Sequence, residues 1–183
     1  MKMKLTLAAL FVALATMGFD CINDPLIVAV NLDPIEACWN VSTGPGNFDQ
    51  TAGPFKISNF IPSGYEDDVT GLRIYDITVH VKGAHPSGVV TGDGYFRLDG
   101  GSEYHLLRFS GQYSAFETDV SVLNPGGLLT IDPAGMSALV AAISDPARLP
   151  TQIVVRGSGA GPAVTTTFQV CCVLKFQASA KAN

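Results

Sequence analysis

A stretch near the C-terminal end, residues 164–178, constrains the fold of this chain most strongly. Successive side chains of a β-strand point to opposite faces. One face of this stretch is wholly apolar, with Phe168, Val170, Cys172, Leu174 and Phe176. The other face is mostly polar, with Thr167, Gln169, Cys171, Val173 and Lys175. The alternation predicts a strand that covers a core with its first face and meets solvent with its second.

Similar strand signals recur along the chain, punctuated by 19 glycines and 11 prolines. We expect strands at residues 26–32 (buried on both faces), 35–41, 55–61, 69–82, 89–98, 104–113, 116–123, 128–131 and 151–156. The Asp93-Gly94 step marks either a hairpin or a bulge. The apolar phase of 69–82 changes near Tyr75, which indicates either a bulge there or a strand that is apolar on both faces at its start. Loops are expected at 42–53 and, as a flexible turn, at 157–162.

One short helix is expected at residues 133–144. Asp132 suits the position before the first turn, and Pro133 suits the first helical position. Strands therefore predominate and do not alternate with helices. The pattern predicts an all-β fold, a mainly antiparallel β-sandwich of immunoglobulin-like or jelly-roll type.

The N-terminal residues resemble an export signal. Lys2 and Lys4 precede a short apolar run, and small residues follow it. We expect cleavage after Gly18, so that residues 1–18 are removed and 19–183 form one domain; cleavage after Ala15 and an uncleaved anchor are the alternatives. Asp20 argues against a lipid anchor on the adjacent Cys21. The expected location is therefore secreted, periplasmic or at the cell surface.

Four cysteines in an exported chain predict disulfides. A bond between the adjacent Cys171 and Cys172 would strain the peptide and break the strand. Cys38 falls on the polar face of its strand, as Cys171 does, which favours Cys38–Cys171 together with Cys21–Cys172. The converse pairing, Cys38–Cys172 with Cys21–Cys171, stays open. The spacing lacks a C-x-x-C motif, so we expect no metal at these cysteines.

No constellation of catalytic residues is visible, and we expect no enzyme, no cofactor and no metal site. Turn carboxylates could hold calcium, but they lack the spacing of a calcium loop; they are Glu66, Asp67, Asp68, Asp93 and Asp99. The histidines His80, His85 and His105 fit no metal motif, and Glu103 and Glu117 suit glycoside hydrolysis by residue type alone. The glycine-rich run 157–161 leads into a strand rather than a helix, so it is no phosphate loop.

The composition limits the kinds of partner that the chain could bind. The formal charge of −5 with few scattered cations excludes nucleic acid. Aromatic residues could form a glycan platform: Trp39, Tyr65, Tyr75, Tyr95, Tyr104 and Tyr113. Asn40 opens a glycosylation sequon.

From these features we expect an exported, non-catalytic protein with a structural, adhesive or assembly role at or outside the cell surface. Self-association or a cell-surface partner would fit such a role. The alternative is a ligand-binding module for a small hydrophobic molecule, such as lipid, or for glycan. A further alternative is a filament subunit that assembles by strand donation from residues 26–32.

Overall fold

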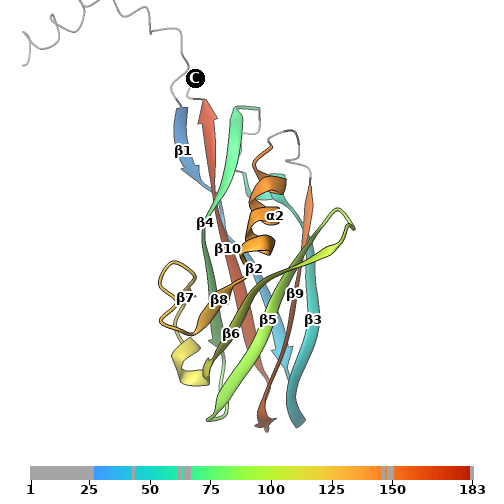
Figure 1. Cartoon of the computed structure of the whole chain (residues 1–183), viewed down its shortest axis with the longest axis vertical. Coiled ribbons are helices and arrows are strands. Elements are labelled where there is room, and N and C mark those ends of the chain that lie inside the picture. The colour runs from blue at the N-terminus through green and yellow to red at the C-terminus, as the bar shows by residue number, and fades with distance from the viewer. Residues whose placement is uncertain are drawn as a thin grey trace, which may run out of the picture.

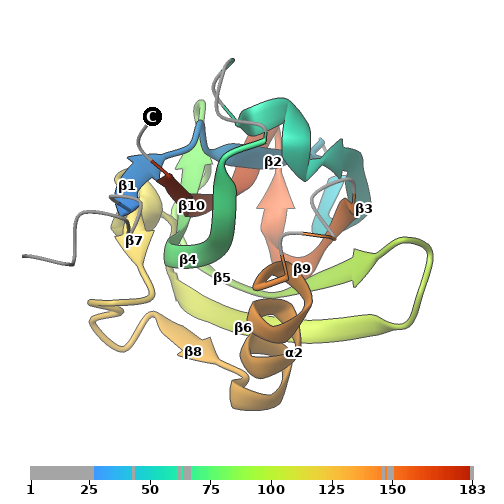
Figure 2. The ribbon, with the colours of Figure 1, turned by 90° about the horizontal axis from the view of Figure 1, so that it is seen from above.

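The computed structural model describes residues 27–42, 44–61, 63, 67–145, 147 and 151–181. They form two five-stranded antiparallel sheets packed face to face, which confirms the predicted β-sandwich (Figures 1 and 2). Sheet A contains β1 (Ile27–Asn31), β2 (Ile35–Val41), β10 (Phe168–Lys181), β4 (Val69–Lys82) and β7 (Val120–Ser121). Sheet B has the order β3 (Gly44–Lys56), β9 (Gln152–Val164), β5 (Val89–Leu98), β6 (Glu103–Gln112) and β8 (Leu129–Ile131).

Strand β10 is the centre of sheet A. It pairs with β4 along one side, and with β2 and then β1 in succession along the other. Its predicted apolar face is buried in the core from Phe168 to Phe176. The polar face differs from expectation, because Cys171 and Val173 are buried as well. Glu36 of β2 contacts His80 and Lys82 of β4 across that face, which covers the residues of β10 between them.

Three glycines let aromatic rings lie directly on strand β9. A Cβ atom built on Gly157 would lie 2.8 Å from the Trp39 ring, and one on Gly159 would lie 2.6 Å from the Phe48 ring. A Cβ on Gly161 would collide with the Tyr113 hydroxyl. The predicted flexible turn at 157–162 is therefore wrong. These residues are the middle of a continuous strand whose glycine face fits the rings of the core.

Other segments also differ from the sequence prediction. The expected loop at 42–53 belongs to β3, and the expected strand at 55–61 is the end of β3 followed by a 3-10 helix, η2 (Ile57–Phe60). Residues 116–123 contain only the short β7, after a second 3-10 helix, η3 (Tyr113–Phe116). Glycine and proline in β3 obscured its strand character. Beyond the last β3 pairs with β9, Ile57 and Ile61 are buried without forming a ladder.

Strands β2 and β4 match the expected boundaries. The predicted bulge near Tyr75 is present, since Asp76 pairs with Lys175 while Ile74 pairs with Phe176. Strand β5 runs unbroken through Gly92 to Gly94, so the bulge interpretation of that step holds rather than the hairpin.

The expected helix is α2 (Pro133–Ile143), which lies against β6 of sheet B (Figure 2). Asp132 caps it by accepting hydrogen bonds from the amides of Ala134 and Gly135. Gly135 lies so close to the His105 carbonyl that a Cβ there would collide with it, which seats the first turn directly on the β6 backbone. Among the described residues, no helix is long and apolar enough to cross a membrane.

Candidate functional site

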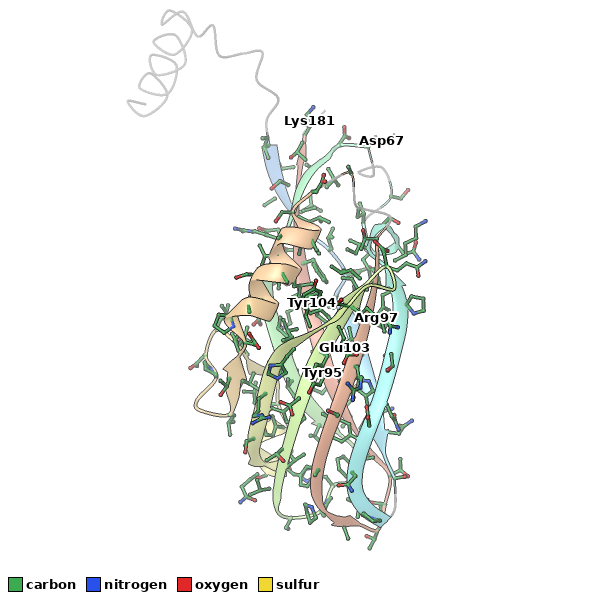
Figure 3. All side chains as sticks on the ribbon, turned by 45° about the vertical axis from the view of Figure 1, so that its right-hand side comes forward. Asp67, Tyr95, Arg97, Glu103, Tyr104 and Lys181 are labelled. Atoms are coloured by element: carbon green, nitrogen blue, oxygen red, sulfur yellow. A yellow bond between two sulfur atoms is a disulfide. The ribbon has the colours of Figure 1, made fainter. Side chains whose placement is uncertain are left out.

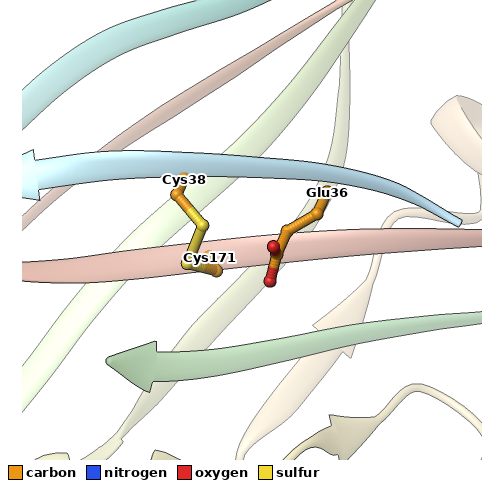
Figure 4. Close-up of side chains that lie close together, drawn as sticks. All are labelled: Glu36, Cys38 and Cys171. Carbon is orange, nitrogen blue, oxygen red and sulfur yellow. A yellow bond between two sulfur atoms is a disulfide. The ribbon is translucent and has the colours of Figure 1, made fainter. Parts of the chain in front are cut away.

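A disulfide joins Cys38 of β2 to Cys171 of β10 on the outer face of sheet A (Figure 4). The two residues lie directly opposite each other in the ladder, with their Cα atoms 4.0 Å apart. This is the pairing that the shared polar face predicts. The bond links segments 133 residues apart and fixes β2 to the central strand.

The second predicted bond, Cys21–Cys172, stays a prediction, because of its two cysteines only Cys172 is described, as a buried thiol with no disulfide partner among the described residues. Cys21 lies outside the described residues. Cys172 points into the core, and it lies nine residues along β10 from Lys181, the partner of Ile27, or about 30 Å. The six residues from Cys21 to Ile27 span at most about 20 Å. Cys21 could therefore approach Cys172 only if β1 left its place.

Burial raises the pKa of the Cys172 thiol to about 12, so the thiol stays protonated and unreactive in the folded protein. We expect a Cys21→Ser variant to show no thiol that reacts with a disulfide reagent under native conditions, and one thiol after denaturation without reductant. The wild-type chain should show one more thiol after denaturation than the variant does. If the denatured wild type instead shows none, Cys21 and Cys172 are bonded.

Next to the disulfide, His80 of β4 lies opposite Cys171 and is only 8% exposed. Its Nε2 is 3.3 Å from Glu36 Oε1, and its Nδ1 is 3.0 Å from Asp119 Oδ1. Neither contact has hydrogen-bond geometry. Glu36 also lies near both cysteine sulfurs, but the sulfurs are bonded to each other, so no thiolate is present to bind a metal.

The outer face of sheet B carries a network of charges across four strands. Arg156 of β9 donates from Nε and Nη2 to the two oxygens of Asp49 on β3, at 2.7 and 3.0 Å, and from Nη1 to Glu103 of β6 at 2.7 Å. Its guanidinium lies 5.0 Å from the centre of the Tyr95 ring. Figure 3 shows Tyr95 and Glu103 together on this face. Arg156 thus ties β3, β9, β5 and β6 together side by side.

A second cluster on the same face connects the sheet to α2. His105 lies between Asp93 and Asp132, with both N···O distances 3.1 Å, and Arg108 pairs with Asp93 at 2.9 Å. A bulge makes this possible: Gly94 pairs with Leu107 and Tyr95 with His105, so Leu106 is an extra residue. The bulge puts His105 and Arg108 on one face, although they are three residues apart.

Each histidine is placed between two oxygen acceptors. His85 follows the same rule, with Nδ1 3.1 Å from the Pro86 carbonyl and Nε2 3.1 Å from Glu117. A neutral imidazole has one N–H, and only the imidazolium donates from both nitrogens.

Glu103 and Glu117, the carboxylates considered for glycoside hydrolysis, are held by different partners, Arg156 and His85. His85 and Glu117 line one pocket together, and Glu103 does not line that pocket.

From the carboxylates on the outer face of sheet B we predict that the folded protein is less stable in acid. The hydrogen bond from Arg156 holds the pKa of Asp49 below its ordinary value, and the bond from His105, with two helix amides, does the same for Asp132. Burial opposes the effect at Asp93, but hydrogen bonds from Arg108 and His105 outweigh it and lower its pKa too. A lowered folded pKa stabilises the protein above the unfolded value of about 4 and loses that contribution as the pH falls through the folded value.

We therefore expect the urea midpoint to fall as the pH drops below about 4. Asp93→Asn should reduce this slope, because it removes one carboxylate that the fold holds ionised. The matched control is Asp33→Asn, at an exposed carboxylate with no ion pair among the described residues. An equal slope in the wild type and Asp93→Asn would contradict the assignment.

The described members of the aromatic set considered for a glycan platform do not lie on one surface. Trp39 and Tyr113 are buried in the core, and Tyr95 is packed between Arg156 and His105. Tyr75 and Tyr104 are exposed but belong to different sheets, and Tyr65 lies outside the described residues.

Two of the turn carboxylates considered for calcium binding, Asp93 and Asp99, form hydrogen bonds to protein groups. Asp99, in the β5–β6 turn, accepts a hydrogen bond from the amide of Gln152 in β9, and Asp93 binds Arg108. Glu66 lies outside the described residues.

A cavity of about 410 Å³ lies between α2 and the β5–β6 hairpin. Small side chains line most of it: Ala138, Ala141, Ala142, Gly101 and Ser102, with Leu98 and Tyr104 at its sides. Tyr104 stacks on the buried Phe96, which fixes its ring in the wall. The cavity is open to solvent, and polar and apolar atoms both line it.

No family model matches the chain, and no curated protein matches it by sequence. Solved structures give weak likenesses. A structure of Desmodium yellow mottle tymovirus has a TM-score of 0.40 and 11% identity, over 88% of this chain and 91% of that one. Turnip yellow mosaic virus at 100 K gives 0.40 and 8%, over 87% and 96%. The decameric BFDV capsid protein gives 0.40 and 10%, over 84% and 99%. These scores are too low to support conclusions about function.

Proposed function

We propose that this chain is an exported, non-catalytic β-sandwich with a structural or assembly role at or outside the cell surface. The Cys38–Cys171 bond is the observation that carries the proposal. Disulfides persist in oxidising compartments and are rare in the reducing cytosol. The bond agrees with the export signal expected at residues 1–18.

The placement of the charged side chains supports the structural role. On sheet B, Arg156 and Arg108 are each held by carboxylates from neighbouring strands, and His105 connects the sheet to the helix cap. These contacts bind β3, β9, β5, β6 and α2 into one unit. A subunit that must keep its shape among neighbours requires such a rigid body.

The test is the fate of the full chain in a cell with an export pathway. We expect the protein in the periplasm or the medium, with an N-terminus after Gly18 and with Cys38 and Cys171 oxidised. N-terminal sequencing and non-reducing peptide mapping report both properties. A cytosolic protein that keeps Met1 and has Cys38 and Cys171 reduced would overturn the proposal.

The cavity beside α2 supports ligand binding as a second candidate. Its volume lies within the range of about 300–1,000 Å³ seen for small-molecule sites, and three alanines of α2 with Leu98 form part of its lining. Native mass spectrometry of the purified chain should then show a co-purified small hydrophobic molecule. Ala141→Leu, which fills the cavity, should remove that mass, while Val140→Leu on the exposed side of α2 should not.

A further inference from the structure

Strand β1 combines an apolar sequence with an exposed position. Its residues Ile27, Val28, Ala29 and Val30 are apolar on both faces, and the sequence predicts a strand buried on both faces. The structure shows otherwise: β1 is an edge strand of sheet A, and none of its side chains belongs to the hydrophobic core. Ile27 is 60% exposed. Within this chain β1 pairs with β10 of its own domain, and the filament interpretation stays a prediction.

The outer edge of β1 lacks the features that protect sheet edges. Such edges usually carry charges, prolines or bulges that block further pairing. Residues 27–31 contain no charge and no proline, and their register with β10 is regular. In the described part of the chain, no strand pairs with this edge. Figure 1 shows β1 at the margin of the layer, beside the end of β10.

The ladder shows which backbone groups face outward. The amide of Leu32 donates to the Phe176 carbonyl at 3.1 Å, and this pair continues the register of β1 with β10. Hydrogen-bonded and non-hydrogen-bonded pairs alternate along an antiparallel ladder. Val28 and Val30 therefore bond to β10, and Ile27, Ala29 and Asn31 direct their N–H and C=O groups away from it.

We infer that β1 pairs edge to edge with β1 of a second copy, antiparallel about a two-fold axis at Ala29; this inference rests on the proposed assembly role. The five-residue strand is self-complementary in this arrangement. Ala29 exchanges both hydrogen bonds with its counterpart, and Val28 packs against the second copy's Val30 in a non-hydrogen-bonded pair, where side chains are closest. The two sheets A then become one continuous sheet.

The contact is small. A five-residue edge buries less than the roughly 1,200 Å² of a stable interface, so the pairing is reversible and depends on concentration. It leaves β2 in place, because the Cys38–Cys171 bond and the buried side chains of β2 hold that strand to the domain.

Sedimentation analysis of the full chain tests the pairing. We expect a monomer–dimer equilibrium, which Ala29→Pro weakens by at least roughly tenfold, because it removes one outward N–H from each copy. Proline is tolerated at an edge position whose N–H faces solvent, so β1 itself should stay paired with β10. Ala29→Lys is a second variant, and it places like charges opposite each other. The control is Val89→Lys, at an exposed position on sheet B, which should dimerise like the wild type.

A cross-link separates edge pairing from strand donation. In a Cys21→Ser background, Val28→Cys combined with Val30→Cys should give a disulfide-bonded dimer, whereas Val28→Cys alone should not. In donation, residues 28 and 30 would face Ala180 and Ala178 of the acceptor, as they face them here, and no cross-link would form. A wild type that is monomeric at every concentration, or a dimer without this cross-link, overturns the inference. Both results leave export and the oxidised Cys38–Cys171 bond, which test the proposed function, unaffected.

Discussion

Replacing Gly157 with alanine is expected to lower the free energy of unfolding by about 1–3 kcal/mol, although alanine is normally at least as good as glycine in a strand. The added Cβ would lie 2.8 Å from the Trp39 ring, and that ring is buried with no room to retreat. Urea denaturation measures the loss. Ser158→Ala is the matched control, because its side chain lies on the outer face of the same strand, and it should stay within about 0.5 kcal/mol of the wild type.

A double-mutant cycle shows whether the clash is the cause. The three atoms nearest to the new Cβ all belong to the six-membered part of the Trp39 indole. Trp39→Phe alone removes volume and destabilises the core, but it also frees space above residue 157. The double variant should therefore lose less stability than the two single losses add up to. Additive losses would mean that the Trp39 ring is not what excludes a side chain at Gly157.

The same contacts explain why the sequence pattern predicted the first part of β9, at 151–156, but missed its continuation from Gly157 onward. Alternation was readable in β2 and β4 because large apolar side chains mark one face of each strand. In β9, glycine marks that face from residue 157 onward, and the bulk comes from Trp39, Phe48 and Tyr113 on other segments. A periodicity in glycine was visible at 157, 159 and 161, but its meaning depends on partners that are distant in the sequence.

The β5–β6 turn shows a second limit. The hairpin signal was assigned to Asp93-Gly94, whereas the chain turns at Asp99 and Gly100, which both have positive φ. Both steps read Asp-Gly, and local chemistry does not distinguish them. Pairing with β9 determines where the chain turns, because β5 stays paired with β9 from Thr91 to Leu98 and the turn can come only after that.

For the candidate sites, the faces of β2 and β10 favoured the Cys38–Cys171 pair that the structure contains, although they left the converse pairing open. The clusters around His80 and His105 escaped prediction. Each brings together residues from separate strands, and the His105 cluster further requires the bulge at Leu106.

Removal of the Cys38–Cys171 bond is expected to lower the free energy of unfolding by about 4 kcal/mol. The bond closes a loop spanning 133 residues, so in the chain-entropy model it strongly restricts the unfolded chain. Cys38→Ala combined with Cys171→Ala should unfold at a lower urea concentration and should no longer respond to reductant. Cys172→Ala is the control: it leaves the bond intact, so its urea midpoint should still fall when a dithiol reductant is added. An unchanged wild-type midpoint in reductant would show that the bond does not form.

The folded state itself should survive this loss. Ile35, Ala37, Trp39 and Val41 are each 3% exposed or less, and they hold β2 in the core independently of the sulfurs. The reduced protein should therefore keep its native near-ultraviolet spectrum below the new midpoint, because the bond acts mainly on the unfolded chain. Loss of that spectrum without denaturant would mean instead that the disulfide holds β2 in place, and that packing alone does not.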